Sequence, residues 1–142
     1  MPLVSRTVRT DGYELLDGGI VDAVPYACLE NRGYDRNVIV LTQPLGYVKT
    51  RDSIQPLIRI CLHRYPEIIR AMAFRYIRYN REMEEIRQRE QEGKVFVIRP
   101  PAPLGIRRTE SNPEELDRVY RIGRKEGEKN LEAVRMFLNG NC

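Results

Sequence analysis

The run Asn37–Thr42 constrains the fold of this chain more than any other segment. It reads Asn-Val-Ile-Val-Leu-Thr, shows no polar alternation and is followed by Gln43 and Pro44. A continuous β-branched run of this length is typical of a strand that is buried on both faces, as in a parallel sheet. Parallel strands are joined by long crossovers, usually helices. The sequence therefore predicts an α/β fold with helices covering a sheet.

The segments upstream of this run complete a predicted βαβ unit. Residues 13–16 form a short apolar stretch that ends in a double glycine and predicts a strand. Residues 25–32 begin with a proline and are followed by Gly33, which predicts a short helix. Strand, glycine turn, helix and buried strand follow one another in the order that a βαβ unit requires.

The rest of the chain is mostly helical by pattern. Apolar residues recur at spacings of three and four between Ser53 and Glu92, with a restart at Pro66. A second apolar run, Val95–Ile98, lies beyond these helices and is expected to pair parallel with the first run in one sheet. A cap, a proline and acidic residues from Asn112 onward predict a final helix that ends near residue 138.

The charge of the chain is concentrated in one segment. The net charge is +4, and residues 51–81 contain seven arginines against only Asp52 and Glu67. Such a segment suits nucleic acid, an anionic membrane surface or an acidic partner, although an ordinary solvated helix face is the preferred explanation. No run of eighteen apolar residues is present, so we expect a cytoplasmic protein, peripheral at a membrane if the basic segment contacts one.

Cysteine and histidine residues give no support for a metal site. The three cysteines, Cys28, Cys61 and Cys142, are widely spaced and form no Cys-x-x-Cys pair. His63 is the single histidine and has no second ligand at a suitable spacing. We therefore expect no metal site.

The triplet Asp17-Gly18-Gly19 is the main candidate for chemistry. An Asp at the end of a strand, followed by glycines, can stand rigidly where a substrate or another backbone comes close. That position suits a catalytic base, although an Asp-Gly pair is also a common turn. Asp22 is expected to brace the turn or cap the following helix, and a role in orienting the loop near Asp17 is the alternative.

The segment Asp17–Pro25 resembles the Asp-Gly-Gly block of bacterial patatin-like phospholipases. The resemblance extends along the chain through further ordered motifs: Leu41-Thr42-Gln43-Pro44-x-Gly46-Tyr47-x-Lys49, Arg64-Tyr65-Pro66, Tyr79-Asn80 and Val97-Ile98-Arg99-Pro100. In that family a serine of a Gly-x-Ser-x-Gly elbow attacks the ester carbonyl, and an Asp is its direct base. The resemblance implies that Asp17 is this base, that Gly18 and Gly19 let it approach the serine, and that Asp22 belongs to the supporting loop.

The chain departs from the family pattern at the nucleophile. Its serines are Ser5, Ser53 and Ser111, none of which lies in Gly-x-Ser-x-Gly, and the glycine-rich oxyanion loop is absent. All three serines read as cap or loop residues. We therefore expect the chain to be a fragment, the C-terminal part of a serine hydrolase of lipid degradation whose N-terminal catalytic half lies elsewhere. By itself the chain should not hydrolyse esters.

The resemblance also implies an architecture and partners. It implies part of a three-layer α/β sandwich with a mainly parallel sheet. Residues 1–50 would end the catalytic core, and residues 51–142 would form a helical C-terminal extension whose strand at about 95–99 rejoins the sheet. Lipid or other acyl esters would be the substrates, with no metal or organic cofactor. Residues 51–81 would be a candidate for contact with a membrane surface. With the other half absent, apolar surface should be exposed, which favours oligomerisation or dependence on a partner.

The alternative to a catalytic role is a binding function. The chain would then be a non-catalytic basic module that docks on an acidic partner, nucleic acid or a membrane surface through residues 51–81. Nucleic acid is the least favoured of these partners, because the arginines are spread at helical spacing among apolar residues and no recognition motif is present.

Overall fold

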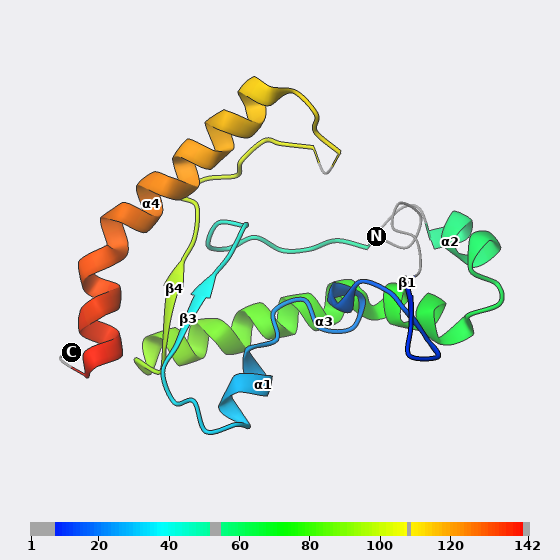
Figure 1. Ribbon diagram of the computed structural model, residues 1–142, viewed down its shortest axis with the longest axis horizontal. Helices are drawn as coiled ribbons and strands as arrows, with labels where there is room; N and C mark the ends of the chain where they lie inside the picture. Colours follow the sequence, from blue (N-terminus) through cyan, green and yellow to red (C-terminus); the bar gives the residue numbers. More distant parts are fainter. Residues whose placement is uncertain (1–7, 52–54, 108, 141–142) are drawn as a thin grey trace. The chain divides into compact units, whose positions relative to one another are not determined.

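The computed structural model describes residues 8–51, 55–107 and 109–140 and shows a mixed α/β protein with more helix than strand (Figure 1). The chain divides into two compact units, described separately below. The first combines the residues up to Pro25 with Val48–Glu85, and the second combines Tyr26–Tyr47 with the residues from Ile86 onward. The predicted division into residues 1–50 and 51–142 stays a prediction.

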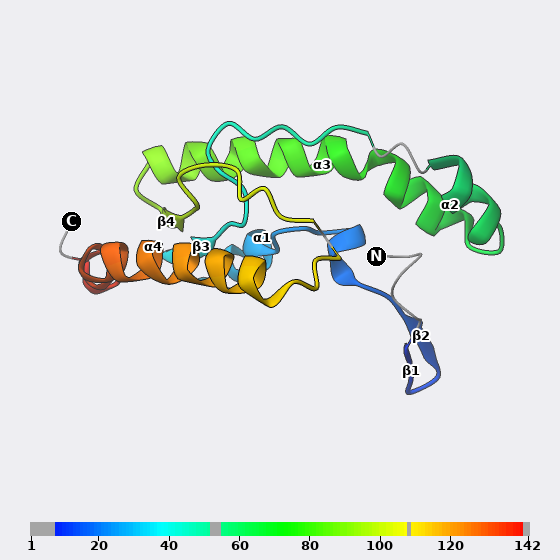
Figure 2. The same ribbon diagram turned by 90° about the horizontal axis from the view of Figure 1, so that it is seen from above.

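The first unit begins with a β-hairpin. Strand β1 (Val8–Thr10) pairs antiparallel with β2 (Tyr13–Leu15), and Thr10 lies opposite Tyr13 (Figure 2). The two turn residues, Asp11 and Gly12, both have positive φ, at 49° and 80°. Positive φ at both central positions defines the turn that suits the right-handed twist of a hairpin, and Asp-Gly is among its preferred sequences.

This pairing corrects the prediction of a βαβ unit. The strand at residues 13–16 exists, but β2 pairs with β1 in a sheet that is separate from the one that contains β3 (Asn37–Val40). The physical reason is local. The Asp11-Gly12 turn pairs β2 with the strand immediately before it, so the strand needs no partner from farther along the chain.

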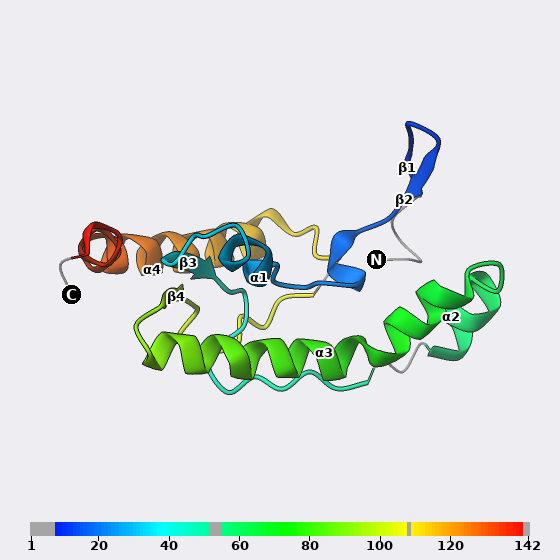
Figure 3. The ribbon, with the colours of Figure 1, turned by 90° about the horizontal axis from the view of Figure 1, so that it is seen from below.

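Two helices and a short apolar cluster complete the first unit. Helix α2 (Gln55–Cys61) is followed by α3 (Pro66–Gln91), whose residues up to Glu85 belong to this unit (Figure 3). Ile20, Ile58 and Met72 are buried together, and partly buried apolar side chains surround them. The predicted helical region is confirmed, and the predicted restart at Pro66 is the first residue of α3.

The second unit contains the parallel pair that the sequence predicts. Strand β3 pairs parallel with β4 (Val95–Ile98), with Asn37 opposite Val95 and Val40 opposite Ile98. The expectation that the first of these strands is buried on both faces is wrong in part, because Ile39 is buried whereas Val40 is 71% exposed. The expected exposure of apolar sheet surface is therefore confirmed at Val40.

Helices packed against the parallel pair complete the second unit. Helix α1 (Tyr26–Glu30) contacts β3, and α4 (Pro113–Asn139) packs on β4 (Figure 1). The rings of Phe96 and Phe137 lie 5.9 Å apart in a tilted arrangement, a favourable geometry for aromatic pairs. The guanidinium of Arg89 lies 2.6 Å from the carboxylate of Glu30 and thereby fastens α1 to the last turns of α3.

The predicted ends of the last helix are confirmed. The side chain of Asn112 accepts a hydrogen bond of 3.0 Å from the backbone N–H of Glu114, as an N-cap does. Gly140 ends the helix with φ 77°, and its N–H donates to the carbonyl of Phe137. No helix in the described part of the chain combines the length and the hydropathy that crossing a membrane requires.

Candidate active-site loop

Asp17 begins a short 3₁₀ helix directly after the hairpin. The helix, η1 (Gly18–Ile20), starts where the carboxylate Oδ1 of Asp17 accepts a hydrogen bond of 2.9 Å from the N–H of Gly19. The backbone of Asp17 is non-helical, at φ −53° and ψ 119°, as an N-cap position requires. The carboxylate is therefore held by its own loop, and the Asp17 side chain is exposed.

Two arginines of α3 bind the backbone of this loop. The Nε of Arg75 donates to the carbonyl of Gly19 at 2.8 Å, and an Nη of Arg78 donates to the carbonyl of Ile20 at 3.0 Å. The same Nη of Arg78 also reaches the carbonyl of Ala71 at 2.8 Å. Charged donors make stronger hydrogen bonds than neutral ones, so these contacts fix the loop on the helix.

The apolar cluster below the loop adds to this fixation. Ile20 is the last residue of η1 and is 5% exposed, against Ile58 and Met72. Its burial places the Asp17 loop over the beginning of α3. The loop that carries the candidate base is therefore positioned by one buried side chain and two arginines.

The two glycines differ in what surrounds them. A Cβ atom at Gly19 would lie 3.2 Å from Oδ1 of Asp17, closer than most such contacts, whereas a Cβ at Gly18 would meet nothing within 4 Å. Gly19 thus allows the carboxylate to fold back over its own loop. The space beside Gly18 is open, so another polypeptide could approach the loop there, as the resemblance implies.

The electrostatics of Asp17 are those of an exposed carboxylate rather than of a desolvated general base. The hydrogen bond from the Gly19 N–H is the main cause that lowers the pKa of the Asp17 carboxyl, and the charge of Arg75 lowers it further. At neutral pH the group is ionised and exposed. The position of the Asp17 carboxylate is well defined, but the described residues do not supply the desolvation that would raise the basicity of this carboxylate.

Asp22 lies at the end of the same loop. Its N–H donates to the carbonyl of Gly18 at 3.0 Å, so its backbone closes the turn. Its side chain is exposed, and α1 begins only at Tyr26, four residues later. The part of the structure that is described gives the Asp22 carboxylate no hydrogen bond.

Glu82 of α3 faces the same stretch and was missed by the sequence reasoning. It accepts a hydrogen bond from the backbone N–H of Ala23, while its Oε2 is buried without a partner in the described structure. Burial is the main cause that raises the pKa of Glu82, and the charge of Asp22 raises it further. The sequence signal for these residues was a set of charged side chains on the helix face that carries the buried Met72. Spacings of three and four place on this face Arg75, Arg78 and Glu82.

The arginines of residues 51–81 therefore have several roles. Arg75 and Arg78 bind carbonyl groups, and Arg81 pairs with Glu85 one turn later on α3 at 2.8 Å. Arg51 and Arg59, together with a third arginine, line a hollow between α2 and α3. The solvated helix face that the sequence allowed is thus only a partial description of this segment.

The other candidate groups belong to other segments of the chain or lie outside the described residues. His63 is exposed, with Nδ1 3.1 Å from the carbonyl of Ile60. Ser111 lies in the turn before α4, and its N–H donates to the Glu110 carboxylate at 3.0 Å, whereas Ser5 and Ser53 lie outside the described residues. Within residues 8–51, 55–107 and 109–140, no group of three or more His, Cys, Asp or Glu side chains is arranged to hold a metal.

Comparison with known proteins identifies a family. The family model described as a domain of unknown function (DUF6363) matches residues 65–139, more than half of the chain, and the chain belongs to this family. The match runs from the residue before α3 to the end of α4 and does not include the Asp17 loop. Neither a curated protein nor a solved structure matches the chain.

Proposed function

We propose that this member of the DUF6363 family is the C-terminal part of a patatin-like lipid acyl hydrolase and supplies the Asp of its Ser-Asp dyad. The observation that carries the proposal is the geometry of Asp17. Its carboxylate is exposed and ionised, and it is held at one oxygen by the Gly19 N–H in a loop that Arg75 and Arg78 fasten to α3. A base held in one place can meet a hydroxyl without first losing conformational freedom.

The chemistry follows from this position. A serine hydroxyl brought to Asp17 would give its proton to the carboxylate while its oxygen attacks the ester carbonyl carbon. Collapse of the tetrahedral intermediate would break the bond to the leaving alcohol, which takes the proton back from Asp17. A water molecule deprotonated by the same carboxylate would then attack the acyl-serine carbonyl carbon. The bond to the serine oxygen would break as that oxygen takes the proton back from Asp17, and the fatty acid would be released. No metal or organic cofactor enters these steps.

The low basicity of Asp17 sets a condition on the proposal. A carboxylate with a lowered pKa is a weak base at neutral pH, and the cause of the lowering is a hydrogen bond that the loop retains. The polypeptide that brings the serine must therefore cover Asp17 and exclude water from it. Covering the carboxylate disfavours its charged form and raises the pKa toward the working range of a general base.

The second unit supports the implied architecture. Strands β3 and β4 are parallel, and Val40 exposes 71% of its surface, as expected of sheet strands that further elements would cover. We propose that this pair belongs to a patatin-like three-layer sandwich that the catalytic half completes. Joining the two halves would bury this apolar surface.

The test is an ester-hydrolysis assay on this chain joined to the polypeptide encoded immediately upstream. The substrates are p-nitrophenyl butyrate and a short-chain phospholipid. We expect hydrolysis by the joined protein, none by the chain alone, and a fall in kcat of at least about 100-fold for Asp17→Asn.

Asp11→Asn is the matched control for this assay. It makes the same chemical change at an exposed turn position of positive φ, which Asn tolerates well. Full activity of the Asp17→Asn protein would remove Asp17 from the mechanism. If the joined protein shows no hydrolysis at all, the non-catalytic basic module becomes the better proposal, and the exposed arginines Arg51 and Arg59 favour it.

A further inference from the structure

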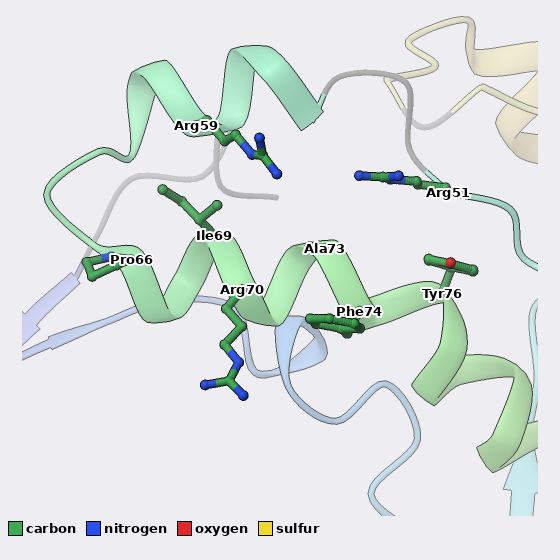
Figure 4. A pocket seen from close by; sticks show the side chains of 8 residues that line it. All are labelled: Arg51, Arg59, Pro66, Ile69, Arg70, Ala73, Phe74 and Tyr76. Carbon is green, nitrogen blue, oxygen red and sulfur yellow. The ribbon is translucent and has the colours of Figure 1, made fainter.

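The hollow between α2 and α3 has the size of a small-molecule site. It lies within the first unit, and its volume is about 450 Å³. Small-molecule pockets commonly measure about 300–1,000 Å³. Arg59 comes from α2, Arg51 from the segment that precedes α2, and Ile69, Ala73 and Phe74 from α3 (Figure 4). Three separate segments thus meet around one space.

Among the described residues that line this hollow, the charged side chains are all arginines. Figure 4 shows the guanidinium groups of Arg51 and Arg59 pointing toward each other above α3, while Arg70 extends away from them on the other side of the helix. No ion pair in the described structure includes any of these three arginines. Two cations that face each other without a carboxylate repel, and an anion placed between them removes that repulsion.

The floor of the hollow is apolar. Ile69 and Ala73 lie on the surface of α3 below the two guanidinium groups. Phe74 also lines the hollow, from the side of α3 on which Arg70 lies, with 53% of its surface exposed. An apolar floor below a cationic pair suits a ligand that is anionic at one end and apolar at the other. Inorganic phosphate would use the arginines and leave this floor uncovered.

Both arginines are carried by segments that are held in place. The side chain of Asn80 accepts from the Lys49 N–H at 2.8 Å and donates to the Lys49 carbonyl at 3.0 Å, two residues before Arg51. Arg59 follows Ile58, whose side chain is fully buried in the apolar cluster. The backbone that carries each arginine is therefore fixed before any ligand enters, and binding has to order only the exposed side chains.

We infer that this hollow binds an anionic headgroup, a phosphate ester, between Arg51 and Arg59, with the apolar tail of the ligand on Ile69, Ala73 and Phe74. The site is distinct from the Asp17 loop, and its ligand binding does not depend on Asp17 acting as a base. Within the basic segment of residues 51–81, the hollow thus offers one defined position for an anionic amphiphile instead of a diffuse basic surface.

The test is a calorimetric titration of the full chain with three soluble probes. These are dihexanoyl phosphatidic acid, dihexanoyl phosphatidylcholine and inorganic phosphate, the lipids kept below their micelle concentrations. Phosphatidic acid should bind most tightly, because it alone joins an uncompensated anionic headgroup to a tail. Equal affinity for phosphatidic acid and phosphatidylcholine, or no binding of phosphatidic acid, would overturn the inference.

Variants locate the site and separate the lipid from free phosphate. Arg59→Gln and Arg51→Gln should each weaken phosphatidic acid binding at least about tenfold, since each removes a charged donor to the headgroup. Arg81→Gln makes the same charge change on α3 outside the hollow and should change the affinity less than about twofold. Equal effects of all three would mean non-specific attraction and contradict a defined site.

Phe74→Ala tests the apolar part of the site. It should weaken binding of phosphatidic acid while leaving that of inorganic phosphate unchanged, because only the lipid has a tail to place on the ring. If inorganic phosphate binds as tightly as phosphatidic acid and Phe74→Ala alters neither affinity, the ligand is a free phosphate and the proposed amphiphile is wrong.

Discussion

Arg78 offers the sharpest test of how the Asp17 loop is held. In the variant Arg78→Met the side chain keeps a similar length and apolar stem but loses the guanidinium that bonds the carbonyls of Ile20 and Ala71. Hydrogen bonds with a charged partner contribute about 1.5–3 kcal/mol each. The Ala71 carbonyl belongs to the α3 backbone and loses less than the loop carbonyl does. We therefore expect the free energy of unfolding to fall by about 2–4 kcal/mol.

The assay combines urea unfolding with hydrogen exchange. Circular dichroism gives the change in the unfolding midpoint, and exchange reports the N–H groups of Val21 and Asp22, which donate to the Gly18 carbonyl at 3.0 Å. Both N–H groups should exchange faster in Arg78→Met, because the loop opens without its anchor. The control is Arg81→Met. Its parent side chain is 81% exposed and pairs with Glu85 in the described structure, so the expected cost is below about 0.5 kcal/mol. Equal stability of the two variants would refute the anchoring role of Arg78.

Three further changes test the packing and charge of the first unit. Asn80→Ala removes two hydrogen bonds to Lys49 and should lower the free energy of unfolding by about 1–3 kcal/mol in urea titrations. Ile58→Ala leaves a cavity at a fully buried position and should lower the free energy of unfolding by about 2–5 kcal/mol. A loss below about 1 kcal/mol would contradict the burial of Ile58. Glu82→Gln should stabilise the protein at neutral pH, with a gain that shrinks as the pH falls toward 4.5.

The sign of the Glu82 prediction follows from its raised pKa. The folded state holds the proton of the Glu82 carboxyl more tightly than the unfolded state does. The parent protein therefore gains stability from this proton in full below the ordinary glutamate pKa of 4.5, and loses that stability as the pH rises through the raised pKa of the folded state. Glutamine keeps an oxygen that can accept from the Ala23 N–H and carries no charge to bury. A gain that is the same at pH 4 and pH 7 would show that the charge is not the cause.

The sequence was most informative where one local signal had no competitor. The runs that became β3 and β4 contain only apolar residues after Asn37 and are separated by long helices, so parallel pairing followed from chain order. The Asn112 cap and its proline located the start of α4 in the same way. These elements were predicted with nearly the boundaries that the structure has.

The hairpin was not predicted, because the chain contains two Asp-Gly pairs and only the second was interpreted as a structural signal. Two such pairs occur six residues apart, at Asp11 and Asp17. The first makes the tight turn between β1 and β2, and the second caps a 3₁₀ helix. Alternation in Val8–Thr10 and Tyr13–Leu15 around the first pair was the available signal for a hairpin.

The candidate site was predicted only in part, for a physical reason. Asp17 and its glycines are contiguous, so their loop could be recognised from sequence alone. The residues that hold the loop, Arg75 and Arg78, lie 56 and 58 residues from the carbonyls that they bind. Charged residues at core spacing do not reveal which distant backbone they contact, and that information comes only from tertiary structure.

The most direct test of the account is the reactivity of the serine that Asp17 is proposed to activate. The measurement is the rate at which a fluorophosphonate ester labels the joined protein across a range of pH, which reports activation of the hydroxyl without requiring a lipid substrate. The account predicts labelling at least about 100-fold slower in Asp17→Asn than in the parent protein, with Asp11→Asn unchanged. Equal labelling rates in Asp17→Asn and the parent protein would contradict it.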